Sequence, residues 1–292
     1  KYVYVIINPR FENSIRLSYS RTENVDNFEE IRHPIVRECM RFVGLEKGVE
    51  IVSIADLPGS TGLGSSSSFT VGLLRALHAY KGEIIFPQQL AEEAYRIEVE
   101  ILKEPIGKQD QYISSFGGVV SMTIERNGQV HLHSLPLGKD SVQKLEQTLL
   151  LFYTGFQRSA SDVLAEQNQS IVQDVNSVLD AMHLIKEIGY KSADALVSND
   201  FKSFGNLLNK HWNAKKNLST NITNSQIDFW YELAMKNGAL GGKIMGAGGG
   251  GFFMFCCPND ARGRIRNVLV NEGLQEMNYY IESEGSKILL DV

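Results

Sequence analysis

The sequence predicts an α/β protein with two domains, expected at residues 1–142 and 143–292. Three observations support this fold class. The chain of 292 residues is long for one domain and short for three. Stretches in which apolar residues alternate, as in strands, are interspersed with stretches at helical spacing. Two glycine-rich stretches each lie next to an apolar element, which is an arrangement that suits ligand binding.

The first half begins with strand patterns and continues with helices. Strands are expected at residues 2–7, 15–20 and 49–54, and helices at 33–43, 69–80 and 87–103. The last of these helices begins at Pro87, a residue type that suits the first helical turn. Asn127 and Gly128 form a strong hairpin signal between two further strands, expected at residues 119–124 and 130–135.

The second half alternates strands with long helices. Strands are expected at residues 148–153 and 251–257, and helices at 161–188, 192–211, 224–237 and 259–272. A final hairpin is expected within residues 279–291, around Glu284 and Gly285. This order of elements indicates a layered α/β arrangement.

The composition excludes several classes of protein. Apolar residues make up 43% of the chain and charged residues 22%, which is ordinary for a globular enzyme, and the net charge of -5 argues against a nucleic-acid or anionic-membrane surface. Cys39, Cys256 and Cys257 are too few for a disulfide framework, so we expect them to be small buried hydrophobic residues. No apolar run is long enough to span a bilayer and no secretory pattern opens the sequence, so we expect a cytoplasmic protein. A homodimer is compatible with the sequence, which does not determine the oligomeric state.

Residues 58–68 form the first glycine-rich stretch, between a strand and an apolar helix. Its glycines permit close approach of a ligand to the backbone, and its serines supply hydroxyl oxygens and are expected to cap the helix. The free N–H groups at the start of that helix would then face an anion. It is neither a Walker A loop, because it lacks the lysine, nor a dinucleotide fingerprint. The alternative is a flexible turn before a well-capped helix.

Glu98 lies on the apolar face of the helix expected at residues 87–103. Helical spacing places it between Ala94 and Leu102, on a face that also includes Ala91, Tyr95 and Ile101. An ionised carboxylate there would be costly unless a cation or a metal ion compensates it. The alternatives are therefore a metal ligand, with a serine hydroxyl of the first glycine-rich stretch as a second ligand, and a structural salt bridge.

Asp110 and Lys108 lie in a polar turn expected at residues 105–112. The Asp110 carboxylate could accept the proton of a substrate hydroxyl or hold that hydroxyl in line. Lys108 is close enough in sequence to influence that carboxylate or to contact a phosphoryl oxygen. The alternative is that Asp110 only caps local structure, as most such aspartates do.

The second glycine-rich stretch, residues 241–251, contains seven glycines in eleven residues and leads directly into an apolar strand. A disordered linker would not usually run into a core strand. Close approach of a ligand or of another backbone segment is the better interpretation.

Together these stretches resemble the motifs of the GHMP kinases. Residues 58–67 resemble the second motif of that family, residues 243–250 its third motif, and Glu98 and Asp110 match its magnesium-binding glutamate and catalytic aspartate in order and spacing. The resemblance implies an N-terminal α/β domain like domain 2 of ribosomal protein S5 and a C-terminal ferredoxin-like domain. The family's first motif is absent and is expected to precede Lys1.

The resemblance also implies roles for individual residues. Asp110 is the expected catalytic group with Lys108 beside it, and Ser66 and Glu98 are expected to hold Mg²⁺. The residues expected to bind the nucleotide are Pro58, Gly59, Ser60, Gly62, Leu63, Gly64, Ser65, Ser66 and Ser67. The residues expected to bind the substrate are Gly107, Gln111, Arg158, Gly246, Ala247 and Gly248.

Within the family, several stretches resemble the kinases of heptose 7-phosphate, among them residues 15–20, 107–112 and 156–161. The resemblance implies transfer of the ATP γ-phosphate to the anomeric hydroxyl of D-glycero-D-manno-heptose 7-phosphate. Such a substrate needs cations for its phosphate, and the candidates are Arg158, Lys108, Lys215 and Lys216, each weighed against a solvated surface charge. The alternatives are a kinase of an unphosphorylated sugar such as L-fucose or galactose, and a catalytically silent ligand-binding relative.

Overall fold

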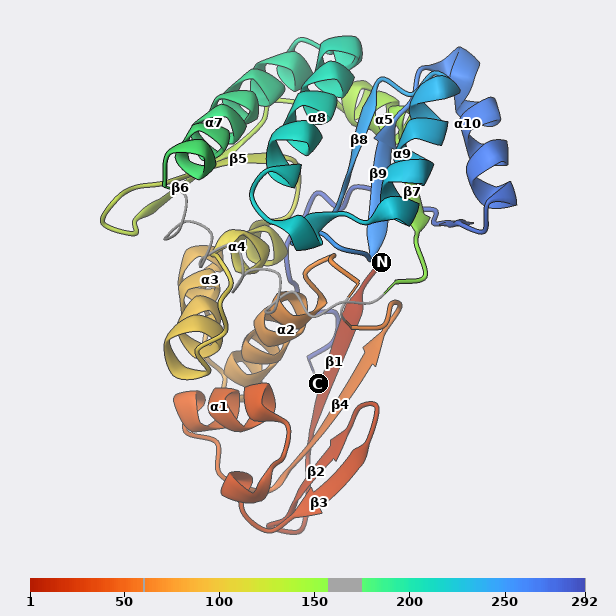
Figure 1. The fold of residues 1–292 in the computed structure, drawn as a ribbon. Coiled ribbons are helices and arrows are strands. Elements are labelled where there is room, and N and C mark those ends of the chain that lie inside the picture. Colours follow the sequence, from red (N-terminus) through yellow and green to blue (C-terminus); the bar gives the residue numbers. More distant parts are fainter. Residues whose placement is uncertain (60, 157–174, 292) are drawn as a thin grey trace. The chain divides into compact units, whose positions relative to one another are not determined.

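The computed structural model describes residues 1–59, 61–156 and 175–291 (Figure 1). Contacts group the chain into two compact units. The first comprises Lys1–Gly59, Gly64–Gly118 and Glu282–Val292, and the second comprises Ser60–Leu63 and Val119–Ile281. The expected domain division at residues 142 and 143 stays a prediction; by contacts, the chain passes into the second unit at Val119 and its last residues return to the first.

The first unit contains a four-stranded sheet. Its strands are β1 (Val3–Pro9), β2 (Ile15–Ser18), β3 (Thr22–Val25) and β4 (Val49–Ala55), in the order β1-β4-β2-β3. β2 runs parallel to β4, and the other two pairs are antiparallel. Ile15 and Leu17 of β2 are buried and the residue between them is exposed, as the alternation of a half-buried strand requires.

Helix α2 (Ser65–Tyr80) packs on this sheet against β1, and α1 (Pro34–Val43), α3 (Pro87–Tyr95) and α4 (Gln109–Phe116) pack against α2. A π-helical turn η2 (Arg96–Ile101) continues α3. Leu73, Leu74 and Leu77 of α2 are fully buried in one core with Ile15 and Leu17. This core fixes the start of α2 against the sheet, and the site described below is built around that start.

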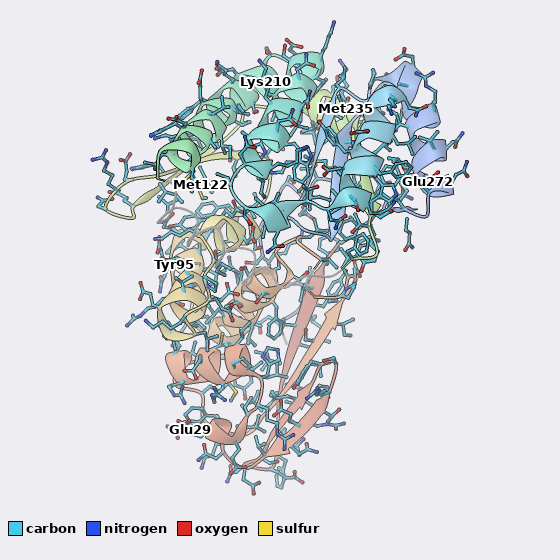
Figure 2. All side chains as sticks on the ribbon, viewed as in Figure 1. Glu29, Tyr95, Met122, Lys210, Met235 and Glu272 are labelled. Carbon is cyan, nitrogen blue, oxygen red and sulfur yellow. The ribbon has the colours of Figure 1, made fainter. Side chains whose placement is uncertain are left out.

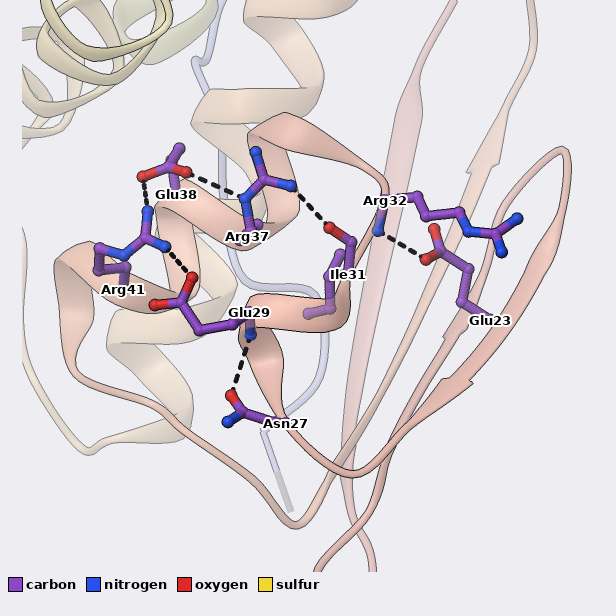
Figure 3. Close-up of polar contacts among 8 residues, drawn as sticks. All are labelled: Glu23, Asn27, Glu29, Ile31, Arg32, Arg37, Glu38 and Arg41. Atoms are coloured by element: carbon purple, nitrogen blue, oxygen red, sulfur yellow. Dashed lines mark hydrogen bonds and ion pairs between the residues drawn. The ribbon is translucent and has the colours of Figure 1, made fainter.

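An ion-pair network lies along α1 (Figure 3). Arg41 bonds to both Glu38 and Glu29, and Arg37 bonds to Glu38 at 3.2 Å and to the carbonyl oxygen of Ile31 at 2.8 Å. Glu38 is buried, and its two arginine partners compensate the charge. The network therefore ties α1 to the short 3-10 helix η1 (Phe28–Glu30).

The second unit contains an antiparallel four-stranded sheet. Its strands are β7 (Leu149–Tyr153), β8 (Gly241–Ile244), β9 (Phe252–Cys256) and β10 (Gln275–Glu276), in the order β10-β7-β9-β8. Alternate residues enter two different cores, Leu150 and Phe152 one core and Leu149 the other. Because both faces of the sheet are covered, β7 and β9 are nearly continuous apolar runs.

The helices of the second unit are α5 (Lys139–Thr148), α7 (Val175–Val197), α8 (Phe201–Lys216), α9 (Ser225–Lys236) and α10 (Asn259–Asn271), with a 3-10 turn η3 (Thr220–Ile222). A separate antiparallel hairpin, β5 (Val120–Ile124) and β6 (Val130–Ser134), carries the expected Asn127-Gly128 turn. The predicted fold class, a two-domain protein of mixed helices and sheets, is confirmed. The three cysteines are all buried and free, as expected.

Four expectations about the elements are wrong. Residues 87–103 are not one regular helix, because the π turn η2 adds a residue to the turn and rotates Ile101 outward, where it is 42% exposed. The expected polar turn at 105–112 includes the start of α4. The expected helix boundary near residue 190 lies within α7, since Gly189 has no close neighbour and the helix continues to Val197.

The hairpin expected at 279–291 is also absent from the described part of the chain's end. Residues 282–286 pack instead against the end of α4, where Gly118 N donates to Glu282 O at 2.8 Å and Ser286 N donates to Ser114 O at 2.8 Å. A Cβ atom on Gly285 would lie 1.9 Å from the carbonyl oxygen of Ser115. The glycine that suggested a hairpin turn is therefore required for close packing.

Among the helices described, none combines the length and apolar character needed to cross a membrane.

Candidate active site

The site in the first unit begins at the N-terminus of α2. Gly64 precedes the helix with φ 68° and ψ 27°, and its carbonyl oxygen accepts the first helical hydrogen bond from Ser68 N at 2.9 Å. No side chain caps this helix, so the expectation that the serines cap it is wrong. The N–H groups of its first turn have no acceptor within the helix and carry the positive end of its dipole. The helix start can therefore receive an anion.

The serines of this turn face Glu98. Ser66 Oγ donates to Glu98 Oε1 at 3.0 Å, and Gln111 Nε2 of α4 donates to Glu98 Oε2 at 2.7 Å. Ser67 and Thr70 also lie near this carboxylate and lower its pKa, while Thr70 Oγ1 donates to Ser66 O at 3.0 Å. The structure thus brings together Ser66 and Glu98, the two residues expected to hold a metal ion, and adds Gln111 as a partner that the sequence did not assign to Glu98.

Glu98 is a buried carboxylate without a protein cation. It is 1% exposed, and no ion pair to it exists among residues 1–59, 61–156 and 175–291. Burial raises the pKa of its carboxyl group, while the hydrogen bonds from Gln111, Ser67 and Ser66 act in the opposite direction. Within the same described part of the chain, the salt bridge considered as an alternative is not found.

The oxygen atoms around Glu98 fit a hard cation that takes few protein ligands. The described residues contain no group of three or more His, Cys, Asp and Glu side chains able to enclose a metal ion. The oxygen ligands available are the Glu98 carboxylate, the Ser66 hydroxyl and Gln111 Oε1, which is buried and has no hydrogen-bond partner in the described part of the chain. Mg²⁺ is commonly held by one or two protein oxygens, with water and nucleotide phosphates as its other ligands, so the residues present fit that ion.

Asp110 lies against the start of α2. A Cβ atom built on Gly64 would stand 3.0 Å from Asp110 Cγ and 3.2 Å from Oδ2. Burial raises the pKa of the Asp110 carboxyl group, and a hydrogen bond from Gln109 partly opposes this. The structure therefore places a carboxylate of raised basicity directly beside the helix start that can bind an anion.

The side chain of Lys108 is held by contacts with α3 and is not simply a solvated surface charge. Its Nζ lies 3.1 and 3.0 Å from the two carboxylate oxygens of Glu92 and 4.5 Å from the ring centre of Tyr95. Tyr112 OH bonds to the same carboxylate. These contacts anchor Lys108 to α3, and its expected action at Asp110 or on a phosphoryl oxygen stays a prediction. Gly107 beside it is exposed.

The second glycine-rich stretch packs against residues 61–63 within the second unit. A Cβ atom on Gly251 would lie 2.1 Å from Thr61 O, and one on Gly246 would lie 2.7 Å from Gly62 O. Gly249 N donates to Ile222 O at 2.8 Å, which fixes the loop to η3. Only glycines allow this backbone contact, so the second stretch supports residues 61–63 of the first.

For several of the residues expected in the site, the structure gives only their exposure or packing and assigns no role. Pro58 and Gly59 are exposed, Leu63 and Ser65 are partly buried, and Ala247 packs on the second unit's core. Ser60 and Arg158 lie outside the described residues. Substrate binding by Gly246, Ala247 and Gly248 stays a prediction.

Residues 32–118 match the GHMP kinases N terminal domain, and residues 192–274 match the GHMP kinases C terminal domain. A helix start that can bind phosphate, beside the buried carboxylate of Glu98 and the partly buried carboxylate of Asp110, suits the transfer of a phosphoryl group. The chain belongs to the GHMP kinase family and is therefore a kinase of small molecules with ATP as co-substrate.

Individual relatives support this assignment. The D-glycero-alpha-D-manno-heptose 7-phosphate kinase of Campylobacter jejuni is 32% identical over 264 residues, which cover 90% of this chain and 76% of that protein. The L-fucokinase/L-fucose-1-P guanylyltransferase of Bacteroides fragilis is 26% identical over 87% of this chain and 27% of its own length. The crystal structure of a D-glycero-D-manno-heptose 1-phosphate kinase from Bacteroides thetaiotaomicron shares the fold, with a TM-score of 0.78, 23% identity and coverage of 97% and 85% of the two chains.

Proposed function

We propose that this chain transfers the γ-phosphate of ATP to the anomeric hydroxyl of D-glycero-D-manno-heptose 7-phosphate, giving the 1,7-bisphosphate and ADP. The contact of Asp110 with Gly64 carries the reaction type, since it sets a basic carboxylate beside a phosphate-binding helix start. The relation to the Campylobacter jejuni enzyme, at 32% identity over 90% of this chain, supports the choice of substrate.

Asp110 acts on the acceptor hydroxyl. The anomeric oxygen forms a bond to the γ-phosphorus as the bond from that phosphorus to the bridging oxygen of ADP breaks, and the hydroxyl proton passes to the Asp110 carboxylate. Burial, which raises the pKa of that carboxyl group, makes the carboxylate a better proton acceptor. The N–H groups at the start of α2 hold the nucleotide phosphates.

Glu98 and Ser66 would hold Mg²⁺, with Gln111 orienting the Glu98 carboxylate through its hydrogen bond of 2.7 Å. When bound, the ion supplies charge neutralisation at the nucleotide phosphates. The burial of Glu98 without a protein cation is the observation that supports this role.

A kinase of an unphosphorylated sugar is the second candidate, since an L-fucokinase is among the relatives. A panel of acceptors separates the two. The purified protein with ATP and Mg²⁺ would be given heptose 7-phosphate, free D-glycero-D-manno-heptose, L-fucose and galactose, with ADP release measured and the product examined by ³¹P NMR. We expect turnover with heptose 7-phosphate and a new resonance from an anomeric phosphate. Turnover with a free sugar and none with heptose 7-phosphate would refute the proposed substrate.

A further inference from the structure

Three basic side chains of the second unit gather beside the second glycine-rich stretch. His211 and Lys215 lie on α8, and Lys243 lies on β8. The two elements are in direct contact, because a Cβ atom on Gly241 of β8 would lie 2.1 Å from the carbonyl oxygen of Gly205 on α8. Lys215 Nζ donates to the carbonyl oxygen of Gly246, three residues after Lys243, and His211 lies one helical turn before Lys215. Repulsion from Lys243 lowers the pKa of both His211 and Lys215.

This cluster has no acid to balance it in the described part of the second unit. Lys215 Nζ donates to the carbonyl oxygen of Gly246, which leaves two of its three N–H groups, and neither lysine forms an ion pair with a described residue. His211 Nδ1 is buried and has no hydrogen-bond partner among the residues described. Basic groups gathered without a counter-charge are costly to ionise, and an anion from solution would compensate them in their charged forms.

The protonation of the cluster is consistent with a missing anion. Burial, followed by repulsion from Lys243, lowers the pKa of Lys215 to about 7, and burial also lowers the pKa of Lys243. Burial and the two lysines lower the pKa of His211 to about 3. A bound anion would favour the charged forms again, so its binding near neutral pH should be accompanied by uptake of protons.

The neighbouring Lys216, unlike Lys215, has an acidic partner within the protein. It lies 3.5 Å from Asp228 and 5.9 Å from the ring centre of Tyr231, so a carboxylate already compensates its charge. Of the two adjacent lysines that the sequence offered as phosphate ligands, the structure therefore favours Lys215. The sequence placed Lys243 in the third motif but assigned no phosphate-binding role to Lys243 or His211, because helix α8 and strand β8 become neighbours only in the folded chain.

We propose that Lys215 and Lys243, together with His211, bind the phosphate group that the sugar substrate already carries. A phosphate monoester has a charge near -2 above its second pKa of about 6, which two ammonium groups match. This inference rests on the proposed function for its choice of a sugar phosphate. The nucleotide is the other source of phosphate, and the experiment separates the two.

The kinetic test compares Lys215→Met and Lys243→Met with the unchanged protein. We expect KM for heptose 7-phosphate to rise roughly ten- to a hundredfold in each variant, because a charge-assisted hydrogen bond is lost. KM for ATP and for free D-glycero-D-manno-heptose should stay unchanged. Lys210→Met is the matched control, since Lys210 is an exposed lysine of the same helix (Figure 2). A rise in KM for ATP instead, or unchanged KM values throughout, would overturn the proposal.

A binding measurement keeps the test independent of folding and of turnover. Calorimetric titration of the unchanged protein with heptose 7-phosphate at pH 7.5, in two buffers of different ionisation enthalpy, should show net proton uptake that free heptose does not cause. Lys215→Arg, which keeps the charge, should retain more affinity than Lys215→Met at equal melting temperature. Binding without proton uptake and with equal affinity in all variants would contradict the site.

The two proposals fail in different ways. If heptose 7-phosphate is turned over but Lys215→Met and Lys243→Met do not affect its KM, the phosphate site is wrong and the proposed function stands. If heptose 7-phosphate is not a substrate, yet inorganic phosphate binds with proton uptake that Lys215→Met abolishes, the proposed substrate is wrong and the phosphate site stands.

Discussion

The α-carbon of Gly64 lies so close to the carboxylate of Asp110 that a methyl group at position 64 would stand 3.0 Å from Asp110 Cγ. The same residue has φ 68°, a conformation that other residues adopt at a cost. Gly64 therefore does two things at once: it turns the chain into α2, and it leaves room for the expected catalytic group beside the helix start.

Gly64→Ala should lower kcat/KM by roughly tenfold or more, because the Asp110 carboxylate must move by a few tenths of an ångström. Its unfolding free energy should also fall by about 1 kcal/mol from the left-handed backbone. Gly44→Ala is the matched control: Gly44 has φ 69° and no atom within 4 Å of a Cβ at that position. It should lose similar stability and keep full activity. Equal activity of the two variants would show that the contact with Asp110 is unimportant.

Asp110→Asn should lower kcat by about 10²- to 10⁴-fold and leave ATP binding intact, since the amide cannot accept the hydroxyl proton. In the unchanged protein, burial raises the pKa of Asp110, so kcat should fall as pH drops through that raised value. The measurements are a pH profile of kcat and a nucleotide thermal-shift assay. Asp140→Asn changes an exposed aspartate in the first turn of α5 and should have no effect. Unchanged turnover in Asp110→Asn would remove the proposed role.

Glu98→Gln should lower kcat/KM by roughly a hundredfold or more and weaken the dependence on Mg²⁺ concentration. Its fold should be kept. Burial raises the pKa of Glu98, so ionisation above that value costs native-state stability, and an uncharged glutamine avoids that cost at neutral pH. The melting temperature at pH 7 should therefore be equal or higher. Glu100→Gln, at an exposed residue 3.8 Å from Arg96, is the control. A large loss of stability in Glu98→Gln would point to a structural role.

Gly241→Ala should destabilise the second unit by about 2 kcal/mol or more, because its Cβ atom would overlap the backbone of Gly205. Gly263→Ala should do the opposite. It lies inside α10 with no atom within 4 Å of a Cβ, so alanine should add about 0.5–1 kcal/mol through helix propensity. Urea unfolding of both variants measures the difference. Equal stability of the two would mean that α8 and β8 can separate without cost.

His211→Gln should make the protein less sensitive to acid. The pKa of His211 is about 3 in the folded protein and about 6.5 when unfolded, so between these values only the unfolded state binds the proton. Stability is therefore lost as pH falls through this window, by up to about 1.4 kcal/mol per pH unit. His211→Gln should lose less over the same range, as measured by urea unfolding from pH 7 to pH 4. His183→Gln, at an exposed histidine of α7, should follow the unchanged protein.

Much of the site could be predicted because it is local in sequence. A glycine- and serine-rich run between a strand and an apolar helix fixes a helix start, and a carboxylate in an apolar helical stripe must find compensation. Ser66 and Glu98 do meet, with Ser66 Oγ 3.0 Å from the carboxylate. The π turn around Glu98 was missed because helical spacing assumes a constant 100° per residue, and a local insertion leaves that pattern nearly unchanged.

By itself, the sequence determined the strands and helices with strong apolar periodicity, the two glycine-rich loops, and the carboxylates at 98 and 110. Periodicity and motif spacing are properties of neighbours along the chain. Only the tertiary structure decided that residues 282–286 pack on the end of α4, that Gln111 bonds to Glu98, and that His211, Lys215 and Lys243 form one basic cluster. These contacts join residues far apart in the chain, and their energies come from burial and charge in a packed interior that no local pattern records.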